Sequence, residues 1–421
     1  KAPVILNSAG TVSPISETTT TQVIPATGSN KVLYWSTGTE TGQKYSSGMS
    51  AHPTDTTKTI VTYTSTADGY ARVMVRSDTT LTAGTAVQFE TTNEALYQQV
   101  ACGKVSGQFL VYYKDGASGY PTAVVGTISG SDCSFGTPLV VTSTDRAYLS
   151  AAADTLTDNK YIVTHINASG QTTAYVATVS GTTVSVGSTQ ALTLPTYHEH
   201  VDCFFNPNVA GAFAVVAMTG SGSYPAINQC TYSGTTVSAS TIYCALSDPG
   251  EDARGAYDAT SGNLVIAYRN RLTPFYGVVR VIEADGTINA AVVTSSSALT
   301  SQTLCTDVAS DPDVTTRFSV ITNALGTVNT RGFYTSGTSG SMTCTLDAAV
   351  QQVTGAASTQ DVRLDYCYET SKFMALWVDG ASEASNGTVQ VFQGAGSAVT
   401  NLTATNFVGI ADAAISSAAT G

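Results

Sequence analysis

Few residues in this chain have the type and spacing that a reaction or a metal site requires. The clearest group is the segment His198-Glu199-His200-Val201-Asp202. Alternate residues of a strand face the same side, so His198, His200 and Asp202 would present two imidazoles and a carboxylate together, a set that can bind a metal ion. The same residues would also suit a hydrogen-bonded polar strand end. They are therefore a candidate metal site with a structural alternative, and no other motif implies a cofactor.

The sequence motifs of covalent catalysis are absent. The chain has four histidines and no G-x-S-x-G nucleophile elbow. It also lacks the repeated S-x-D-x-G-x-T-W turns of sialidase-type proteins. Paired carboxylates for glycoside hydrolysis come together only in three dimensions, so the sequence leaves that chemistry open. We expect a protein that is not an enzyme, with a glycoside hydrolase as the less favoured alternative.

The charge of the chain excludes several classes of partner. Its formal net charge is −12, its charged fraction is 11%, and its basic residues do not cluster. Nucleic-acid binding and attraction to anionic membranes both depend on clustered Lys and Arg. No apolar run approaches the roughly 20 residues that span a bilayer. We therefore expect neither a nucleic-acid partner nor membrane insertion.

An apolar five-residue segment recurs along the chain at a nearly constant interval. The intervals between successive copies are 50, 52, 52, 51, 54 and 55 residues. A fixed period of this size is the mark of a repeat architecture. The copies are Thr59–Tyr63, Phe109–Tyr113, Tyr161–His165, Phe213–Ala217, Leu264–Tyr268, Phe318–Thr322 and Phe373–Trp377.

Each repeat reads as four short strands separated by turn residues. Residues 97–142 give YQQVACG, QFLVYYKD, YPTAVVGTIS and CSFGTPLVVTS, divided by Gly, Ser and Asp. Segments rich in Val, Ile, Thr and Tyr with such turns form antiparallel hairpins. Seven repeats of four strands predict an all-β fold, a seven-bladed β-propeller of four-stranded antiparallel blades. The recurring apolar segment is then the second strand of each blade.

The ring needs a closing strand, because the last repeat has a weak fourth strand. The segment Lys31–Trp35 precedes the first full repeat by about half a period, and we expect it to complete the seventh blade. The alternative is a simple extra edge strand. The predicted organisation is an N-terminal arm (1–28), a propeller (29–404) and a C-terminal tail (405–421).

Two arginines fall in first strands, which line the central channel of a propeller. Arg254 and Arg363 could point into that channel as ligand-binding groups, or could pair with nearby acids such as Asp252 and Asp361. Ion pairing is the structural alternative to ligand binding here.

The chain has eight cysteines, and its few charges and many hydroxyl side chains suggest an oxidising setting. No cysteine lies in a C-x-x-C pair, which disfavours a zinc ribbon. Disulfides are expected, with buried free thiols as the alternative. The disulfide candidates are Cys102, Cys133, Cys203, Cys230, Cys244, Cys305, Cys344 and Cys367, and the glycosylation candidates are Asn167, Asn386 and Asn401.

Both flanking segments resemble parts of tailed-phage virion proteins. Ala2–Ile15 (APVILNSAGTVSPI) is similar to an opening segment of such proteins, and Asn401–Ser417 (NLTATNFVGIADAAISS) resembles a segment that follows propeller repeats in large tail proteins of marine phages. Related modules belong to other extracellular appendage proteins. The resemblance implies a tail or surface component. The cysteine content departs from it, because virion proteins assemble in a reducing cytosol.

These observations lead to one main functional prediction and one alternative from another class. The main prediction is a structural or adhesive subunit of a virion or extracellular filament, located on the virion surface or outside the cell. Its partners would be copies of itself, other subunits, or a host-surface glycan or receptor. The alternative is a carbohydrate-binding, lectin-like propeller with aromatic and amide pockets between its blades.

Overall fold

The computed structural model describes the greater part of the repeat region and four short segments outside it. Among the described residues every regular element is a β-strand, and there is no helix long and apolar enough to cross a membrane. The described residues are 3–6, 12–14, 32–35, 47–65, 68–77, 80–91, 94–144, 147–194, 200–219, 224–258, 261–271, 277–293, 306–312, 316–324, 327–347, 351–353, 362–368, 372–379, 386–393 and 409–410.

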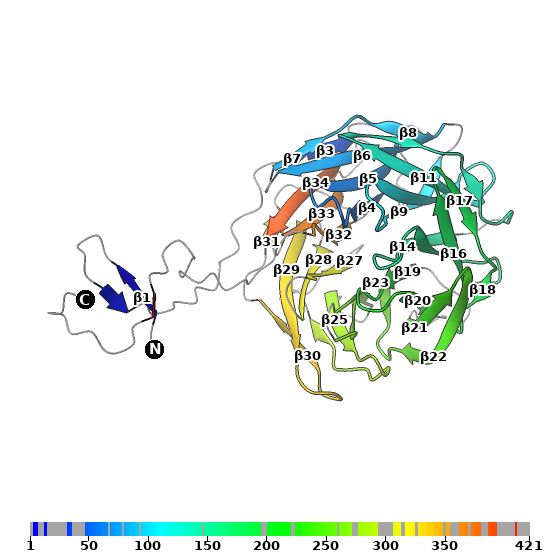
Figure 1. The fold of residues 1–421 in the computed structure, drawn as a ribbon. Coiled ribbons are helices and arrows are strands. Elements are labelled where there is room, and N and C mark those ends of the chain that lie inside the picture. The colour runs from blue at the N-terminus through cyan, green and yellow to red at the C-terminus, as the bar shows by residue number, and fades with distance from the viewer. Residues whose placement is uncertain are drawn as a thin grey trace.

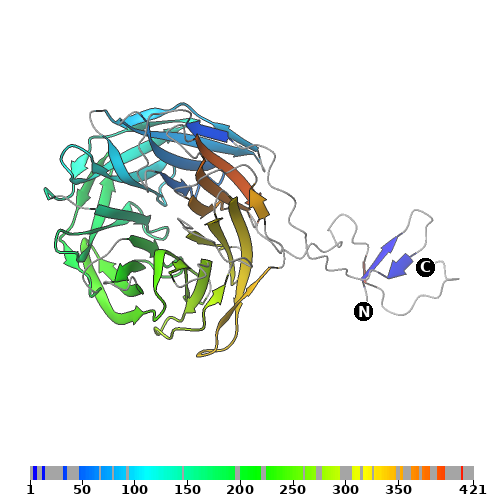
Figure 2. The same ribbon diagram turned by 180° about the vertical axis from the view of Figure 1, so that it is seen from behind.

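Seven small antiparallel sheets surround a central axis, as Figure 1 shows. In that view the chain runs once round the ring, so that the first blade (blue) lies beside the last (orange). Figure 2 shows the same closed ring from behind. A four-stranded sheet cannot bury both faces alone, and stacking the sheets face to face around an axis covers them. The predicted seven-bladed propeller is confirmed.

The blades follow one another in sequence, and the strands of each blade are given in order from the innermost outward. Blade 1 holds β4 (Gly48–Ala51), β5 (Lys58–Ser65), β6 (Asp68–Ser77), β7 (Thr80–Ala83) and β8 (Val87–Glu90). Blade 2 holds β9 (Ala95–Cys102), β10 (Gln108–Asp115), β11 (Pro121–Ser129), β12 (Asp132–Phe135) and β13 (Leu139–Val140). Blade 3 holds β14 (Ala147–Ala153), β15 (Lys160–Ile166), β16 (Thr172–Ser180), β17 (Thr183–Val186) and β18 (Gln190–Ala191).

The remaining blades repeat this order. Blade 4 holds β19 (Val201–Phe205), β20 (Ala212–Thr219), β21 (Tyr224–Ser233) and β22 (Thr236–Ala245). Blade 5 holds β23 (Gly250–Tyr257), β24 (Leu264–Asn270), β25 (Gly277–Ile282) and β26 (Val292–Val293). Blade 6 holds β27 (Thr306–Ser310), β28 (Arg317–Ala324), β29 (Thr327–Ser336), β30 (Thr343–Leu346) and β31 (Gln351–Val353). Blade 7 holds β32 (Val362–Tyr366), β33 (Lys372–Asp379), β34 (Asn386–Gln393) and β3 (Val32–Trp35).

The seventh blade takes its outermost strand from the N-terminal part of the chain. Strand β3 pairs antiparallel with β34, with Val32 opposite Val389 and Leu33 opposite Thr388. The sheet order is β3-β34-β33-β32. The expectation that Lys31–Trp35 completes this blade is therefore confirmed, and residues from the two ends of the repeat region close the ring.

Strands from both ends of the chain also form a separate three-stranded sheet. Strand β1 (Pro3–Leu6) pairs with β2 (Val12–Pro14) on one side and with β35 (Gly409–Ile410) on the other. Figure 1 draws this sheet apart from the ring. The predicted arm (1–28) and tail (405–421) thus contribute strands to one sheet.

The second strand of each blade forms the core, because it has a sheet on both faces and a strand on both edges. Phe109, Tyr113, Phe213 and Trp377 are fully buried there. Apolar clusters fill the space between successive blades; that between blades 3 and 4 includes Ile162. The unbroken apolar runs in the sequence follow from this burial on both faces.

Close contacts between blades on the outer side depend on glycines. A Cβ built on Gly136, in blade 2, would lie 1.8 Å from the Thr182 carbonyl oxygen in the outer turn of blade 3. A Cβ built on Gly84 would likewise lie 1.8 Å from the Ser131 carbonyl oxygen of the next blade. Only a residue without a side chain allows the two backbones to approach this closely. The recurring S-G-S/T turn motifs in the sequence therefore have a docking partner one repeat earlier.

The expected disulfides are absent among the six cysteines that the structure describes. Each of these is a buried free thiol: Cys102, Cys133, Cys203, Cys230, Cys344 and Cys367. Cys305 and the side chain of Cys244 lie outside the described residues. The thiols fill apolar space between blades, as Cys203 does in the cluster with Val215. They behave as small core side chains rather than as cross-links.

Candidate functional site in the central channel

One register position of the innermost strands carries most of the channel's charge. One residue follows each innermost strand and begins the turn to the second strand. The position described here lies four residues before that turn residue. Polar and charged side chains occupy it in six of the seven blades. We call this set the inner ring: Gly48, Gln99, Ser150, Asp202, Arg254, Asp307 and Arg363.

Side chains of the inner ring bind the backbone of the next blade. The Oδ2 atom of Asp202 accepts a hydrogen bond from the Gly255 N–H at 3.2 Å, and Oδ2 of Asp307 accepts one from the Leu364 N–H at 2.9 Å. Ser150 Oγ plays the same part for Cys203, at 3.1 Å. An innermost strand exposes one edge to the channel, where its N–H groups need acceptors. The inner ring supplies them and holds its own carboxylates in fixed orientations.

A second set of contacts lies two residues further along the same strands. Ser50 Oγ accepts a hydrogen bond from the Cys102 N–H at 3.1 Å, which joins blades 1 and 2. Oδ2 of Asp365 accepts one from the Ala51 N–H at 2.7 Å, which joins blades 7 and 1. Both polar side chains therefore face the channel from positions fixed by the neighbouring blade.

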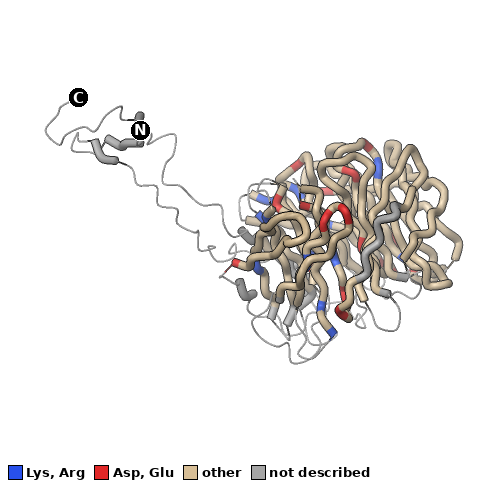
Figure 3. Tube along the Cα trace, turned by 90° about the horizontal axis from the view of Figure 1, so that it is seen from below, with Lys and Arg blue, Asp and Glu red and all other residues tan. Residues whose placement is uncertain are grey.

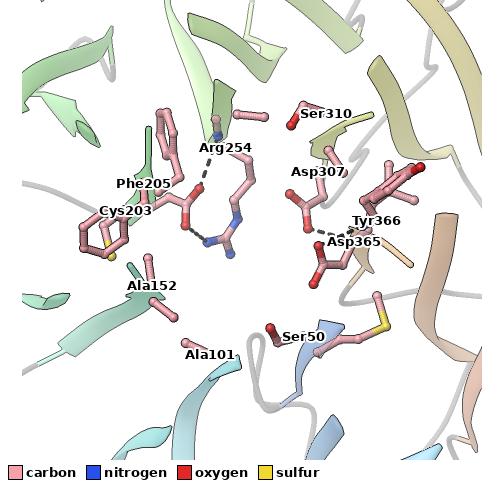
Figure 4. Close-up of a pocket in the computed structure, with 18 of the residues that line it drawn as sticks. Ser50, Ala101, Ala152, Cys203, Phe205, Arg254, Asp307, Ser310, Asp365 and Tyr366 are labelled. Atoms are coloured by element: carbon pink, nitrogen blue, oxygen red, sulfur yellow. Dashed lines mark hydrogen bonds and ion pairs between the residues drawn. The ribbon is translucent and has the colours of Figure 1, made fainter. Parts of the chain in front are cut away.

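These strands enclose a cavity of about 270 Å³ at the end of the channel where the first strands turn into the second. All seven blades contribute to its lining. Figure 4 shows small side chains, Ala101 and Ala152, on one part of the wall and charged ones on the rest. The cavity is therefore strongly asymmetric although the fold around it repeats.

Arg254 and two aspartates line this cavity from three successive blades, Arg254 from blade 5, Asp307 from blade 6 and Asp365 from blade 7. In Figure 4 the guanidinium of Arg254 reaches toward the channel centre, and the carboxyls of Asp307 and Asp365 lie side by side. Nη1 of Arg254 lies 3.4 Å from Oδ1 of Asp202. The two side-by-side carboxyls accept backbone N–H groups at both oxygens: Asp307 from Val308 and Leu364, Asp365 from Tyr366 and Ala51.

Burial makes both of these carboxyls weak acids. Desolvation raises the pKa of Asp307 to about 6, although the Arg254 and Arg363 charges oppose that rise. Desolvation also raises the pKa of Asp365 to about 7, and the negative charge of Asp307 adds to the shift. Two carboxyls that repel each other in a low-dielectric wall favour sharing a proton or a cation.

An aromatic and polar band borders the cavity toward the other end of the channel. It lies two residues before the inner ring and comprises Tyr97, Tyr148, His200 and Asp252 on four successive blades. The ring centroids of Tyr97 and Tyr148 are 5.4 Å apart, as are those of Tyr148 and His200, and His200 Nε2 lies 2.8 Å from Asp252 Oδ1. Both tyrosines pack against the apolar cluster of blades 6 and 7 that includes Val362. Because they reach across the channel, these tyrosines narrow it at this end.

The backbone of this band is unusual in a repeated way. Tyr97, Tyr148 and Asp252 have φ angles of 50°, 52° and 53°, in the left-handed region that non-glycine residues rarely adopt. The register of the inner strand shifts beside each of them, as at a β-bulge. At each bulge the backbone changes direction, which re-orients the side chain at the point where the strand enters the channel.

Of the three candidate metal ligands, the structure describes His200 and Asp202. His198 lies outside the described residues, His200 binds Asp252, and Asp202 faces Arg254 and Gly255. Within the described part of the chain no group of three His, Cys, Asp or Glu could hold a metal ion. The hydrogen-bonded strand end is the arrangement seen for His200.

The two predicted channel arginines do line the cavity. Arg254 contacts Asp202, and Asp361 lies outside the described residues. Of the sequons, Asn167 begins a turn in blade 3, and the side chains of Asn386 and Asn401 are outside the described set.

Asp307, Asp365 and Ser50 were not identified from the sequence. Each is an ordinary polar residue in a short strand, and no local motif marks it. The signal is positional: after alignment of the repeats on the turn residue, Asp307 shares the register of Arg254. Asp365 shares the register of Ser50.

Charged residues elsewhere on the molecule are interspersed. Figure 3 shows Lys and Arg segments scattered among Asp and Glu along the described chain, without a basic face. This arrangement agrees with the absence of basic clusters in the sequence.

Comparison with known proteins identifies the fold and no family. No family model and no curated protein matches the sequence. Among solved structures, the BP39L lectin of Burkholderia pseudomallei matches with a TM-score of 0.58 at 10% identity, over 85% of this chain and 99% of that chain. Hydrazine synthase of Kuenenia stuttgartiensis matches with a TM-score of 0.56 at 9% identity, over 87% and 99%. Sqt1 of Saccharomyces cerevisiae matches with a TM-score of 0.51 at 10% identity, over 87% and 99%. Identities this low show a shared propeller fold alone, and this fold carries both lectins and enzymes.

Proposed function

We propose that this protein is a carbohydrate-binding, lectin-like propeller whose ligand site is the cavity of the central channel. The observation that carries the proposal is the set of fixed polar groups facing that cavity. Arg254 offers N–H donors, while Asp307 and Asp365 offer acceptors from the next two blades. Sugar hydroxyls both donate and accept, so they match a wall that presents both kinds of group.

The remaining lining suits the apolar faces of a sugar ring. Phe205, Tyr257 and Tyr366 contribute to the cavity wall, and the small Ala101 and Ala152 leave room beside them. The cavity volume of about 270 Å³ is near the lower end of small-molecule sites, which run from roughly 300 Å³ upward. We therefore expect one monosaccharide unit to enter, as a free sugar or as the end of a glycan.

The fold comparison adds support from the BP39L lectin, which shares the propeller and is named for carbohydrate binding. Its likeness to this chain concerns the backbone, so it does not identify a sugar or a site. The grouping of the charged inner-ring residues on blades 4 to 7 comes from this chain alone.

Glycan-array screening followed by ligand-observed NMR tests the proposal. An Arg254→Gln variant should lose glycan binding while keeping its fold, because the change removes the positive charge and the forked N–H donors of the guanidinium without emptying the space. A Lys114→Gln variant is the matched control, since Lys114 pairs with Leu96 at the other end of blade 2, away from the cavity. Absence of any glycan binding, or binding that survives in Arg254→Gln, would refute a ligand site in the channel.

The arrangement of the two carboxyls favours binding over hydrolysis. Glycosidases place one carboxyl on each side of the bond that they cleave. Asp307 and Asp365 come from adjacent innermost strands and lie on the same wall in Figure 4. A glycosidic bond in this cavity would face both from one side. We therefore expect no release of reducing sugar from glycans that bind.

A structural or adhesive role in an extracellular assembly is the second candidate. The supporting observation is the three-stranded sheet in which β1 joins β2 and β35, because it makes one unit from segments outside the ring. Such a unit could dock with copies of this chain or with other subunits on a virion or filament surface. Electron microscopy and sedimentation of the full chain, and of a variant lacking residues 1–28 and 405–421, would test this. Assembly that is unchanged by the deletion would contradict it.

A further inference from the structure

We infer that the channel cavity prefers sugars that carry a protonated amine over their neutral counterparts. The inference rests on the proposed carbohydrate-binding function and specifies the chemical class of its ligand. It is drawn from the unlike groups of the cavity wall, with Arg254 on blade 5 and the carboxyls of Asp307 and Asp365 on blades 6 and 7. Sugar hydroxyls would meet Arg254, and the ammonium group would meet Asp307 and Asp365.

The charges of the lining residues leave an excess of one negative charge when all of them are ionised. Three carboxylates stand against two guanidinium groups in the cavity wall: Asp202, Asp307 and Asp365 against Arg254 and Arg363. Asp202 is already engaged by Arg254 and by the Gly255 N–H. The excess therefore falls on the Asp307 and Asp365 side, where a ligand cation would offset it.

The orientation of these two carboxylates suits an ammonium group. Each oxygen already accepts one backbone N–H, which fixes the carboxylate plane before a ligand arrives. A carboxylate has about four acceptor positions, so each retains capacity for a second donor. A protonated amine offers three donors and can bridge neighbouring carboxylates, whereas a hydroxyl offers one. Prior fixing of the acceptors lowers the entropic cost of binding.

Proton affinity supports the same conclusion. The raised pKa values of Asp307 and Asp365 show that this wall favours a positive neighbour or a proton over two bare charges. A ligand ammonium would displace that proton. The charged or titratable groups that affect the pair are, for Asp307, Arg254, Arg363 and Asp202, and for Asp365, Asp307, with Cys102 and Tyr368 nearby.

A metal ion fits this wall less well than an amine. Calcium takes about six to eight oxygen ligands, and magnesium requires an octahedral set. The described part of the chain holds no group of three carboxylate, imidazole or thiolate side chains that could provide such a set. An ammonium group needs no such shell.

Titration calorimetry or ligand-observed NMR with glucosamine, glucose and N-acetylglucosamine tests the inference. The three sugars share one ring and differ at the nitrogen-bearing position. We expect glucosamine to bind at least about tenfold more tightly than the other two. Its affinity should rise by up to roughly tenfold per unit between about pH 5 and about pH 6.5, because one proton leaves the pair on binding. The affinities of the neutral sugars should change little over that range.

Two isosteric variants localise the effect. Asp365→Asn and Asp307→Asn each remove a charge while keeping an acceptor, and each should reduce the glucosamine preference and its pH dependence while neutral sugars still bind. Asp285→Asn is the charge-matched control, because Asp285 lies in an exposed turn of blade 5 outside the cavity lining. With two variants, the inference can still be tested if one of them fails to fold.

The outcomes separate this inference from the function on which it rests. Equal binding of all three sugars, abolished by Arg254→Gln, would keep the carbohydrate site and overturn the amine preference. A glucosamine preference that persists in both aspartate variants would also overturn it. Absence of binding by every sugar would refute both proposals.

Discussion

The Oδ2 atom of Asp365 accepts a 2.7 Å hydrogen bond from the backbone N–H of Ala51, a residue 314 positions away in the sequence. This bond crosses the seam between the last blade and the first on the channel side. Pairing of β3 with β34 closes the same blade on the outer side. The ring is thus closed at both radii by residues from opposite ends of the repeat region.

The seam bond should contribute measurably to stability. Asp365→Ala leaves the buried Ala51 N–H without this acceptor, so we expect a loss of about 1–3 kcal/mol in the free energy of unfolding. Urea unfolding at about pH 5 measures it, because the carboxyl is then largely neutral and loss of its charge does not offset the effect. Ser50→Ala, which removes the equivalent bond to Cys102, should cost a similar amount. An Asp365→Ala protein as stable as the wild type would show that the seam bond is not needed.

The glycine contacts between blades predict a steric effect. Gly136→Ala places a methyl group 1.8 Å from the Thr182 carbonyl oxygen, so the two backbones must separate, at about 1–3 kcal/mol or more. Gly130→Ala is an informative comparison, because nothing lies within 4 Å there and its φ of 63° adds conformational strain alone. Thermal unfolding of the two variants separates the effects. A Gly136→Ala protein that melts with the wild type would mean that the blades do not touch at this point.

The two raised carboxyl pKa values predict how stability depends on pH. Between the unfolded value of 3.8 and the folded values of about 6 and about 7, the folded state binds more protons than the unfolded state. The contribution of Asp307 and Asp365 is therefore fully present below about pH 3.8 and is lost as the pH rises through about 7. Asp365→Asn should flatten this decline over pH 4 to 7, whereas Ser50→Ala, which removes no titrating group, should leave its slope unchanged. A slope unaffected by Asp365→Asn and Asp307→Asn would contradict the assignment.

His52 should act in the opposite direction. Burial lowers the pKa of this imidazole, whose Nδ1 lies 3.1 Å from the Asp55 N–H and caps its turn. Its contribution is present above the unfolded pKa of 6.5 and is lost as the pH falls toward the lower folded value. Asn206 caps the equivalent turn of blade 4 by accepting the Asn208 N–H at 2.9 Å. His52→Asn should therefore keep the cap and remove the loss of stability below pH 6.5, measured by denaturant titration; a loss equal to that of the wild type would rule out His52 as its source.

The fold could be predicted because its physical cause repeats. Second strands such as Phe109–Tyr113 are buried on both faces in every blade, so each copy shows the same unbroken apolar run. The closing role of Lys31–Trp35 followed from the weak fourth strand of the last repeat and from the place of this segment about half a period before the first full repeat. Turn glycines such as Gly130 also recur at a fixed offset, because each must adopt a positive φ.

The cavity could be predicted only in part. Arg254 and Arg363 fall in first strands, so the channel was one predicted place for their side chains and an ion pair with a nearby acid was the other. The partner of Arg254 was not predicted, because inner-ring side chains contact a neighbouring blade, about 52 residues away in the sequence. In the sequence, only their register within the repeats distinguishes Asp307 and Asp365 from ordinary surface carboxylates. Composition misled for the cysteines, because a hydroxyl-rich chain suggests an oxidising setting, whereas Cys203 is held in an apolar interface.

The described thiols should be chemically silent in the folded protein. Burial raises the pKa of Cys133, Cys203 and Cys344 to about 12, and the thiolate is the form that alkylating reagents attack. We expect iodoacetamide to leave the six described cysteines unmodified under native conditions and to alkylate them all in urea without prior reduction, as read by peptide mass spectrometry. Samples prepared with and without reductant provide the control. Native alkylation at any of these six positions, or a disulfide-linked peptide pair between two of them, would contradict the buried-thiol arrangement and restore the cross-links that the cysteine count first suggested.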